Sequence, residues 1–558
     1  MAQYVIQVKS GNRWSLHSYK DSEAAAVKQS RQLLKQKVVD EAQVIKKGEG
    51  EDKIVFNENV NSIKRKAGLG HITDCPVYET VDDLFLPQSM LALSRMLRDY
   101  CDQMTFTPTE LMHNHRLLEK FCDDALFASA VEHLAALQAV KAQKNEQECR
   151  EKIFDLFDQA KEKARGSGFD NLQNNGLNEY IANAGDLNDP AVRYRVNLSL
   201  SKSTMMSPSW EGKFVVLFEL LGKADIEALH ENTALFLDEI LSEFFAIPNA
   251  IVEMLGQQPD RYNAIDVLTK LCIARYEARK WDTPGLQRVS ELMTKLPMAK
   301  SRSRLANRVE QMLRSRSSLT KGDIHEEKHA FKQLLPLFIA KNGSILGGEG
   351  MAEALAMCGT RSFNRDRNLE NPSEAIEYIM ENLKAPILQL RFLLTLSKSP
   401  FGKDCADIVC KFLPQFMEGP EHVHDIVHYK LPLKRKLKIL TGLQKSALAI
   451  KLPNKMNETF ASWLDDLIFD YLNEERIIDK MDSPEDTLFQ RATALLQFCA
   501  SGLLIEGRTL NWVRQRVQEH LRQPNFVEKF TEDVQTTKKK ELVITQLHAM
   551  LKKAGLQE

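Results

Sequence analysis

Apolar and polar residues alternate one by one near the N-terminus of the chain, as they do in half-buried β-strands. The first two alternating runs flank Gly11-Asn12, a pair that favours a tight turn, so they predict a β-hairpin. A helix and two further strands are expected after the hairpin. Residues 1–58 therefore predict a small α+β module in the order ββαββ. The expected strands cover residues 4–8, 14–19, 43–47 and 53–56, and the helix begins after residue 22.

From about residue 82 onward, apolar residues recur at spacings of three and four, and strand signals nearly vanish. This spacing predicts a mostly helical body with room for roughly twenty helices of ordinary length. Residues 59–81 carry Gly68, Gly70 and Pro76 without clear periodicity, a composition typical of a linker. Breaks at glycine and proline divide the body into helical segments over residues 82–166, 167–342 and 343–558.

Five stretches of the body share one pattern, in which a Leu-rich apolar helix, a short polar loop and a second amphipathic helix follow each other. Stacked helical hairpins show this pattern, and a non-repetitive helical domain contains it as well, so both interpretations stay open. The predicted fold class is mainly α, with a small N-terminal α+β module before a large all-helical body. The five stretches begin at Lys213, Val267, Gln389, Lys436 and Gln490.

Composition and charge narrow the class of protein. The chain has 558 residues, 43% of them hydrophobic, and a formal net charge of −1, which excludes a disordered chain and predicts no overall attraction to nucleic acid. Nine cysteines without a CxxC pair favour reduced thiols over a disulfide framework. We find no apolar N-terminal leader and no apolar run of transmembrane length, so we expect a cytoplasmic protein.

Residues 430–455 form the strongest charge feature, with eight basic residues and no acidic one, on a pattern that predicts an amphipathic helix. Such a helix can bind an acidic protein, and nucleic acid or anionic lipid are alternatives. The favoured interpretation of the stretch is internal, because residues 458–486 carry ten acidic residues that can neutralise it. The residues predicted to contact a partner protein are Lys434, Arg435, Lys436 and Lys438.

Two further segments are candidates for binding an anion. Residues 300–321 are rich in arginine, which suits phosphate contacts, but contain no aromatic residue for base stacking. Residues 343–350 form a glycine-rich loop before a helix, without the Lys-Ser or Lys-Thr of a nucleotide-binding loop. A solvated helix face and an ordinary helix connection are the alternative interpretations. The candidate anion-binding residues are Arg302, Arg304, Arg308, Gly347 and Gly348.

No catalytic motif of a serine hydrolase, kinase or zinc protease occurs in the chain. His424 and His428 have helical i and i+4 spacing, which is a weak signal for a metal, so we expect no metal and no cofactor. We therefore predict a non-enzymatic interaction or scaffold protein that binds through helical surfaces. The alternative is a regulatory protein that binds nucleic acid or a nucleotide through residues 300–321 and 430–455. The partner and the oligomeric state are not predicted.

Overall fold

The computed structural model confirms the predicted fold class. The chain is 69% helical, and its described residues form 29 α-helices and one small antiparallel sheet of four strands near the N-terminus. The structure describes residues 3–10, 13–35, 41–47, 53–59, 68–166, 168, 172, 176–222, 226–340, 344–364, 366–532 and 536–556. The two expected turns at residues 11–12 and 48–50 lie outside these ranges.

The N-terminal module has the predicted ββαββ order. Its strands pair antiparallel in the spatial order β2-β1-β3-β4, so the two hairpins join through the central strands β1 and β3. The elements are β1 (Gln3–Ser10), β2 (Arg13–Lys20), α1 (Glu23–Lys35), β3 (Glu41–Lys47) and β4 (Lys53–Asn59).

Helix α1 covers one face of the sheet and closes a small core. Ile6 and Val44 are fully buried on that face and pack with Ala26 and Leu34 of the helix. The alternation of apolar and polar residues along β1 and β3 puts these side chains on the same face, since neighbouring residues of a strand point to opposite sides. The alternating pattern that predicted the strands is thus the pattern of side chains that enter this core.

The chain forms two compact units. Unit 1 comprises Met1–Gly256 together with Trp281–Arg288, and unit 2 comprises Gln257–Lys280 together with Val289–Glu558. Helix α14 (Pro284–Lys295) begins in unit 1 and ends in unit 2. The boundaries predicted after residues 166 and 342 stay predictions.

Unit 1 is helical after the N-terminal module. Residues 68–80, part of the expected linker, have no regular structure but lie against α6: Gln138 accepts from the backbone N–H of Tyr78 at 3.3 Å and donates to the carbonyl of Pro76 at 2.8 Å. The elements are η1 (Val81–Phe85), α2 (Pro87–Met96), α3 (Arg98–Met104), α4 (Pro108–Met112), α5 (His115–Cys122), α6 (Ala125–Ala142), α7 (Glu146–Gly166), α8 (Leu177–Ala184), α9 (Pro190–Thr204), α10 (Trp210–Leu221), η2 (Ile226–Ala228), α11 (Glu231–Ala246) and α12 (Pro248–Leu255).

In its described residues, unit 2 has helices joined by loops and no β-strand. One isolated β-bridge joins Ile339 and Ile345. Its elements are α13 (Arg261–Cys272), α15 (Ala299–Arg314), α16 (Ile324–Leu334), η3 (Leu335–Phe338), α17 (Gly348–Phe363), α18 (Pro372–Asn382), α19 (Pro386–Leu396), α20 (Pro400–Asp404), α21 (Ala406–Glu418), α22 (Val423–Ile426), α23 (Leu433–Leu448), η4 (Pro453–Lys455), α24 (Met456–Glu474), α25 (Ile477–Met481), α26 (Leu488–Ala500), α27 (Arg508–Leu521), α28 (Phe526–Phe530) and α29 (Thr537–Lys553).

Prolines set many of the helix boundaries. Pro108, Pro190, Pro248, Pro372 and Pro400 each stand in the first turn of a helix, where the missing N–H costs no hydrogen bond. Each of these prolines therefore marks the start of a helix. Among the described residues, no helix combines the length and the apolar character that crossing a membrane requires.

The expected helical hairpins are only partly present as direct pairs. Helix α23 packs against α24, and α26 packs against α27, as the pattern predicts. By contrast, α19 packs against α17 and α23, and α10 packs against α9 and α12. A shared amphipathic pattern therefore leads to different partners in different parts of the chain.

Candidate functional site

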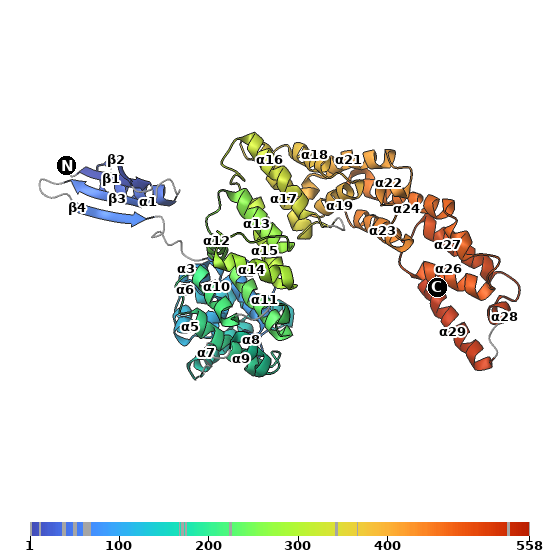
Figure 1. The fold of residues 1–558 in the computed structure, drawn as a ribbon, viewed down its shortest axis with the longest axis horizontal. Coiled ribbons are helices and arrows are strands. Elements are labelled where there is room, and N and C mark those ends of the chain that lie inside the picture. Colours follow the sequence, from blue (N-terminus) through green and yellow to red (C-terminus); the bar gives the residue numbers. More distant parts are fainter. Residues whose placement is uncertain are drawn as a thin grey trace. The chain divides into compact units, whose positions relative to one another are not determined.

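Residues 430–455, the second basic stretch along the chain, contain helix α23. This helix packs its apolar side against α24 and α19 (Figure 1). Leu437 and Leu440 are fully buried, and Leu443 is nearly so. The Nε2 of Gln444 donates to the carbonyl oxygen of Ala461 in α24 at 3.1 Å. These contacts fix which side of α23 faces solvent.

Lys436 lies on the buried side of this helix. Its Nζ donates to the hydroxyl of Tyr471 at 3.2 Å and lies 5.2 Å from the centre of the Tyr471 ring. The residue is 5% exposed, so its charge is held by the aromatic ring and the hydroxyl inside the unit. The structure thus separates Lys436 from the other residues predicted to contact a partner.

The other three predicted residues, Lys434, Arg435 and Lys438, are exposed. At 3.6 residues per turn, Lys434, Lys438 and the exposed Lys445 fall within about 40° of one another around the helix axis. Among the described residues, no ion pair joins any of these four side chains to a carboxylate. We call these four residues the basic face of α23.

The expected neutralisation of the basic stretch by residues 458–486 is wrong for α23. Between the two stretches, the described residues form one ion pair, from Lys455 to Glu458 at 3.5 Å, and these two residues are neighbours in the chain. The acidic side chains instead bind bases of α26 and α27. These pairs are Asp466 with Arg508 (2.8 Å), Asp482 with Arg491 (2.8 Å) and Asp479 with Arg516 (3.2 Å).

The arginines predicted to bind an anion all lie on α15. Arg302 donates from Nη1 to the carbonyl of Cys272 at 2.8 Å and from Nη2 to the carbonyl of Leu296 at 3.2 Å. These carbonyls stand at the C-terminal ends of α13 and α14, where a positive charge is favourable, so Arg302 caps two helices. Arg304 and Arg308 lie one turn apart on α15 and are half-buried.

Gly347 and Gly348 form the turn that begins α17. Their φ angles are +74° and +65°, in the left-handed region that glycine adopts at little cost. Helix α15 packs against α17, and Nη2 of Arg314 donates to the carbonyl of Gly350 at 3.2 Å. The structure thus brings residues 300–321, the first basic stretch along the chain, into contact with the glycine-rich loop through Arg314. Gly343 lies outside the described residues.

A cleft of about 750 Å³ joins the start of α17, the turn before α20 and the end of α23. Three of its lining residues are lysines, and one, Glu349, is acidic. The volume is in the range of small-ligand sites. Lys451 belongs to the second basic stretch, residues 430–455. Lys398 and Lys403 belong to no basic stretch, so the sequence did not predict them as site residues. The lining residues are Glu349, Ser397, Lys398, Lys403, Ala449, Ile450 and Lys451.

The histidines do not form a metal site in the described residues. Helix α22 ends at Ile426, so His424 and His428 do not share a helical turn. His424 contacts the ring of Tyr471 at 5.5 Å, and His428 stacks on Tyr429 at 4.9 Å. In the described ranges, no group of three or more His, Cys, Asp or Glu side chains is arranged to hold a metal ion.

Unit 1 contains a buried polar network that the sequence did not indicate. Lys213 and Glu110, each with 2% of its side chain exposed, form an ion pair at 2.6 Å, and Thr204 donates to the same Glu110 oxygen at 2.6 Å. The neighbouring Glu243 accepts from the backbone and the hydroxyl of Thr109 at 3.1 and 2.7 Å. Because these groups are closed off from solvent, the network holds α4, α9, α10 and α11 together.

Two surfaces of unit 2 thus present basic residues to solvent, the basic face of α23 and the lysine-lined cleft. Positive charge, rather than an acid–base pair or a nucleophile with its base, is the chemistry that both surfaces offer. Comparison with models of protein families, with curated proteins and with solved structures finds no match to this chain.

Proposed function

We propose that the chain is a non-enzymatic scaffold or adaptor that holds an acidic segment of another protein on the basic face of α23. One observation carries the proposal: Lys434, Arg435 and Lys438 have no carboxylate partner among the described residues, although α23 packs against the acid-rich α24. Exposed basic side chains that no adjacent carboxylate neutralises attract an acidic partner and direct its approach.

Exposed apolar residues near both ends of α23 favour a protein as the partner. Tyr429, just before the helix, is 62% exposed, and Leu448, its last residue, is 49% exposed. Protein interfaces combine such apolar contacts, which supply binding energy, with charges that set specificity. An acidic peptide with apolar side chains would satisfy both kinds of group.

A regulatory protein that binds nucleic acid or a nucleotide is the second candidate. The lysine-lined cleft favours it, because Lys398, Lys403 and Lys451 offer three ammonium groups for phosphates. Against it, Arg302 of the first basic stretch is committed to backbone carbonyls. The cleft also has no aromatic lining residue on which a base could stack.

Fluorescence anisotropy of a labelled oligoglutamate peptide, titrated with the full chain at low salt, tests the proposal. We expect binding that weakens as salt rises and is lost in the variant K434E/R435E/K438E, because each reversal replaces attraction by repulsion. Lys436 is left unchanged, since its contact with Tyr471 supports the fold.

A matched control carries the same change in net charge at three scattered exposed lysines of unit 2, K332E/K384E/K411E. This control should keep peptide binding, and both variants should keep the helical circular dichroism. Equal loss of binding in both variants would mean that only net charge matters. A labelled oligonucleotide that binds while the peptide does not would favour the second candidate.

A further inference from the structure

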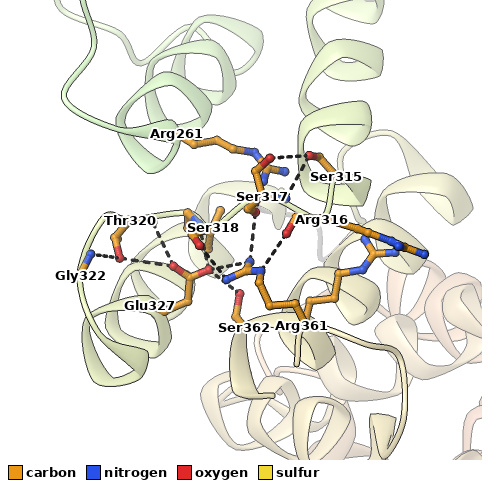
Figure 2. A network of polar contacts seen from close by, with 12 residues as sticks. Arg261, Ser315, Arg316, Ser317, Ser318, Thr320, Gly322, Glu327, Arg361 and Ser362 are labelled. Atoms are coloured by element: carbon orange, nitrogen blue, oxygen red, sulfur yellow. Dashed lines mark hydrogen bonds and ion pairs between the residues drawn. The ribbon is translucent and has the colours of Figure 1, made fainter. Parts of the chain in front are cut away.

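The loop between α15 and α16 combines arginines with hydroxyl groups (Figure 2). Its sequence after Arg314 is Ser-Arg-Ser-Ser-Leu-Thr, and Arg316, Ser317 and Ser318 are exposed. Leu319 anchors the loop, because its side chain is fully buried and its carbonyl accepts from the backbone N–H of Tyr262 at 2.8 Å. The hydroxyl-bearing part of the loop is therefore held at the surface.

One carboxylate organises the loop from below. Glu327 of α16 accepts from the backbone N–H groups of Leu319 and Thr320 at 2.9 and 3.0 Å. It also accepts from the hydroxyl of Ser362 at 3.2 Å and pairs with Arg367 at 3.1 Å. The hydroxyl of Thr320 donates to it as well, at 3.3 Å. With its oxygens engaged by these five groups, Glu327 has little capacity left for further arginines.

Three arginines from other parts of unit 2 donate to backbone carbonyls of the loop or of Arg314, the residue before it. Arg367 donates to the carbonyl of Arg316 at 2.8 Å and to Oγ of Ser318 at 2.9 Å. Arg261 donates to the carbonyl of Ser317, and Arg361 donates to the carbonyl of Arg314. The loop thus lies among guanidinium groups.

Positive charge exceeds negative charge in this cluster. Arg314 pairs with Glu310 and Glu353, and Arg367 pairs with Glu327, whereas no carboxylate among the described residues pairs with the other three arginines. Five guanidinium groups therefore face three carboxylates, an excess of two. The arginines without a carboxylate are Arg261, Arg316 and Arg361.

Arg261 also keeps hydrogen-bonding capacity. Nη2 of Arg261 is buried and has no hydrogen-bond partner. Burial lowers the pKa of Arg261 and of Arg361, and the charges of neighbouring arginines, Arg367 for the first and Arg316 for the second, act in the same direction. A cluster of like charges with an unsatisfied donor gains stability when an anion enters it.

We propose that the arginine–serine loop binds a phosphate dianion through Arg261, Arg316 and Arg361. A phosphate group carries about two negative charges at neutral pH, which equals the local excess, and its oxygens suit the planar guanidinium fork. The phosphate belongs either to a free ligand or to a phosphoserine of the loop itself.

The phosphoserine source requires a protein kinase and ATP. Oγ of Ser318 forms a bond to the γ-phosphorus, the bond from that phosphorus to its bridging oxygen breaks, and ADP leaves. The hydroxyl proton passes to a base of the kinase. Ser318 is exposed, and its Oγ accepts from Arg367 at 2.9 Å, so the new ester would carry its charge into the cluster.

Isothermal titration of the full chain with inorganic phosphate tests the site, with sodium chloride at equal ionic strength as the comparison. We expect phosphate binding in the unmodified chain and at least about tenfold weaker binding in R316M, the loss expected for one charge-assisted hydrogen bond. Arg316 suits the test because its side chain is exposed and only its carbonyl supports the loop. R261M is the second variant and should weaken binding similarly.

The matched controls are the single variants R275M and K332M, each of which removes one exposed charge of unit 2, and Arg275 lies just beyond the other end of α13. Both should bind phosphate as the unmodified chain does. Absence of phosphate binding to a folded chain would overturn the proposal. Equal affinity in R316M, R261M and the unmodified chain would do so too, since it places the anion elsewhere.

A chain carrying phosphoserine at position 318, introduced by genetic-code expansion, distinguishes the sources. A higher unfolding temperature together with loss of phosphate binding supports the proposal with the loop's own serine as the source. Unchanged stability, in a chain whose unmodified form binds phosphate, supports it with a free ligand as the source.

Discussion

Glu110 shows how much one side chain can hold in place in unit 1. Its Oε2 accepts from the backbone N–H of Thr107, while Thr107 Oγ1 accepts from the N–H of Glu110, so the two residues cap α4 reciprocally. Its other oxygen binds Lys213 and Thr204. The carboxylate therefore joins the start of α4 to α9 and α10.

Removing one charge of this pair should cost far more than removing both. We expect K213M to lower the free energy of unfolding by about 3–5 kcal/mol, because it leaves the Glu110 charge buried without its cation. The double variant E110Q/K213M should recover most of that loss, since the glutamine Oε1 can still accept from the N–H of Thr107 while its Nε2 donates to the hydroxyl of Thr204. Urea unfolding followed by circular dichroism measures both. A cost below about 1 kcal/mol for K213M would contradict the predicted penalty for a buried charge without its partner.

Glu243 and His113 should give stability opposite dependences on pH. Burial raises the pKa of Glu243 to about 7, and burial lowers the pKa of His113 to about 4. The folded state therefore holds the Glu243 proton more tightly than the unfolded state, so this residue's contribution falls as pH rises from 4.5 to about 7. His113 resists protonation when folded, so its contribution falls as pH drops from 6.5 to about 4.

The variant E243Q should reveal the pH dependence of stability that comes from His113 alone. Relative to the unmodified chain, the free energy of unfolding of E243Q should rise by about 1.4 kcal/mol per pH unit. This rise should occur between pH 4.5 and about 7, the range over which Glu243 lowers stability. Below pH 6.5, the stability of E243Q should decline more steeply than that of the unmodified chain. Thermal unfolding midpoints across this range measure the difference. Parallel curves for the two proteins would show that Glu243 is ionised in the folded state throughout.

At the scale of the element, the amphipathic pattern predicted α23 and the side that it buries, because helical periodicity is a local property. It did not predict which charges meet. Asp466 binds Arg508, 42 positions away, and the choice of that partner depends on how α24 and α27 pack. The internal neutralisation expected for α23 failed for this reason. His428 was misplaced for a local reason, since Val427 has extended backbone angles that end α22.

A glycine in α20 marks a close approach of two elements. A Cβ on Gly402 would lie 1.8 Å from the carbonyl oxygen of Leu396 at the end of α19. We expect G402A to lower the free energy of unfolding by about 1–3 kcal/mol, because the backbone of α19 must move. The control G442A adds a methyl group into open space on α23 and should stabilise the chain by about 0.5–1 kcal/mol. Equal effects on the urea midpoint would contradict the predicted clash.

At the scale of the whole molecule, the sequence predicted the class of fold and the order of the N-terminal module. The strands were predictable because Ile6, Val44 and their neighbours repeat with the period of a strand. The arginine–serine loop was not, because Arg261, Arg316 and Arg361 stand far apart along the chain and no local pattern joins them. The same holds for Lys398 and Lys403 of the cleft.

The path of the chain between its two units has a consequence for the gene. The chain leaves unit 1 after Gly256, returns for Trp281–Arg288, and leaves again. The returning segment is seated in unit 1, where Thr283 donates to the carbonyl of Met254 and Gly285 lies close against Phe214. A gene fragment that ends at codon 256 would encode a first unit without this segment. A gene fragment that encodes unit 1 in full must therefore run on through codon 288, and it carries residues 257–280 of unit 2 with it.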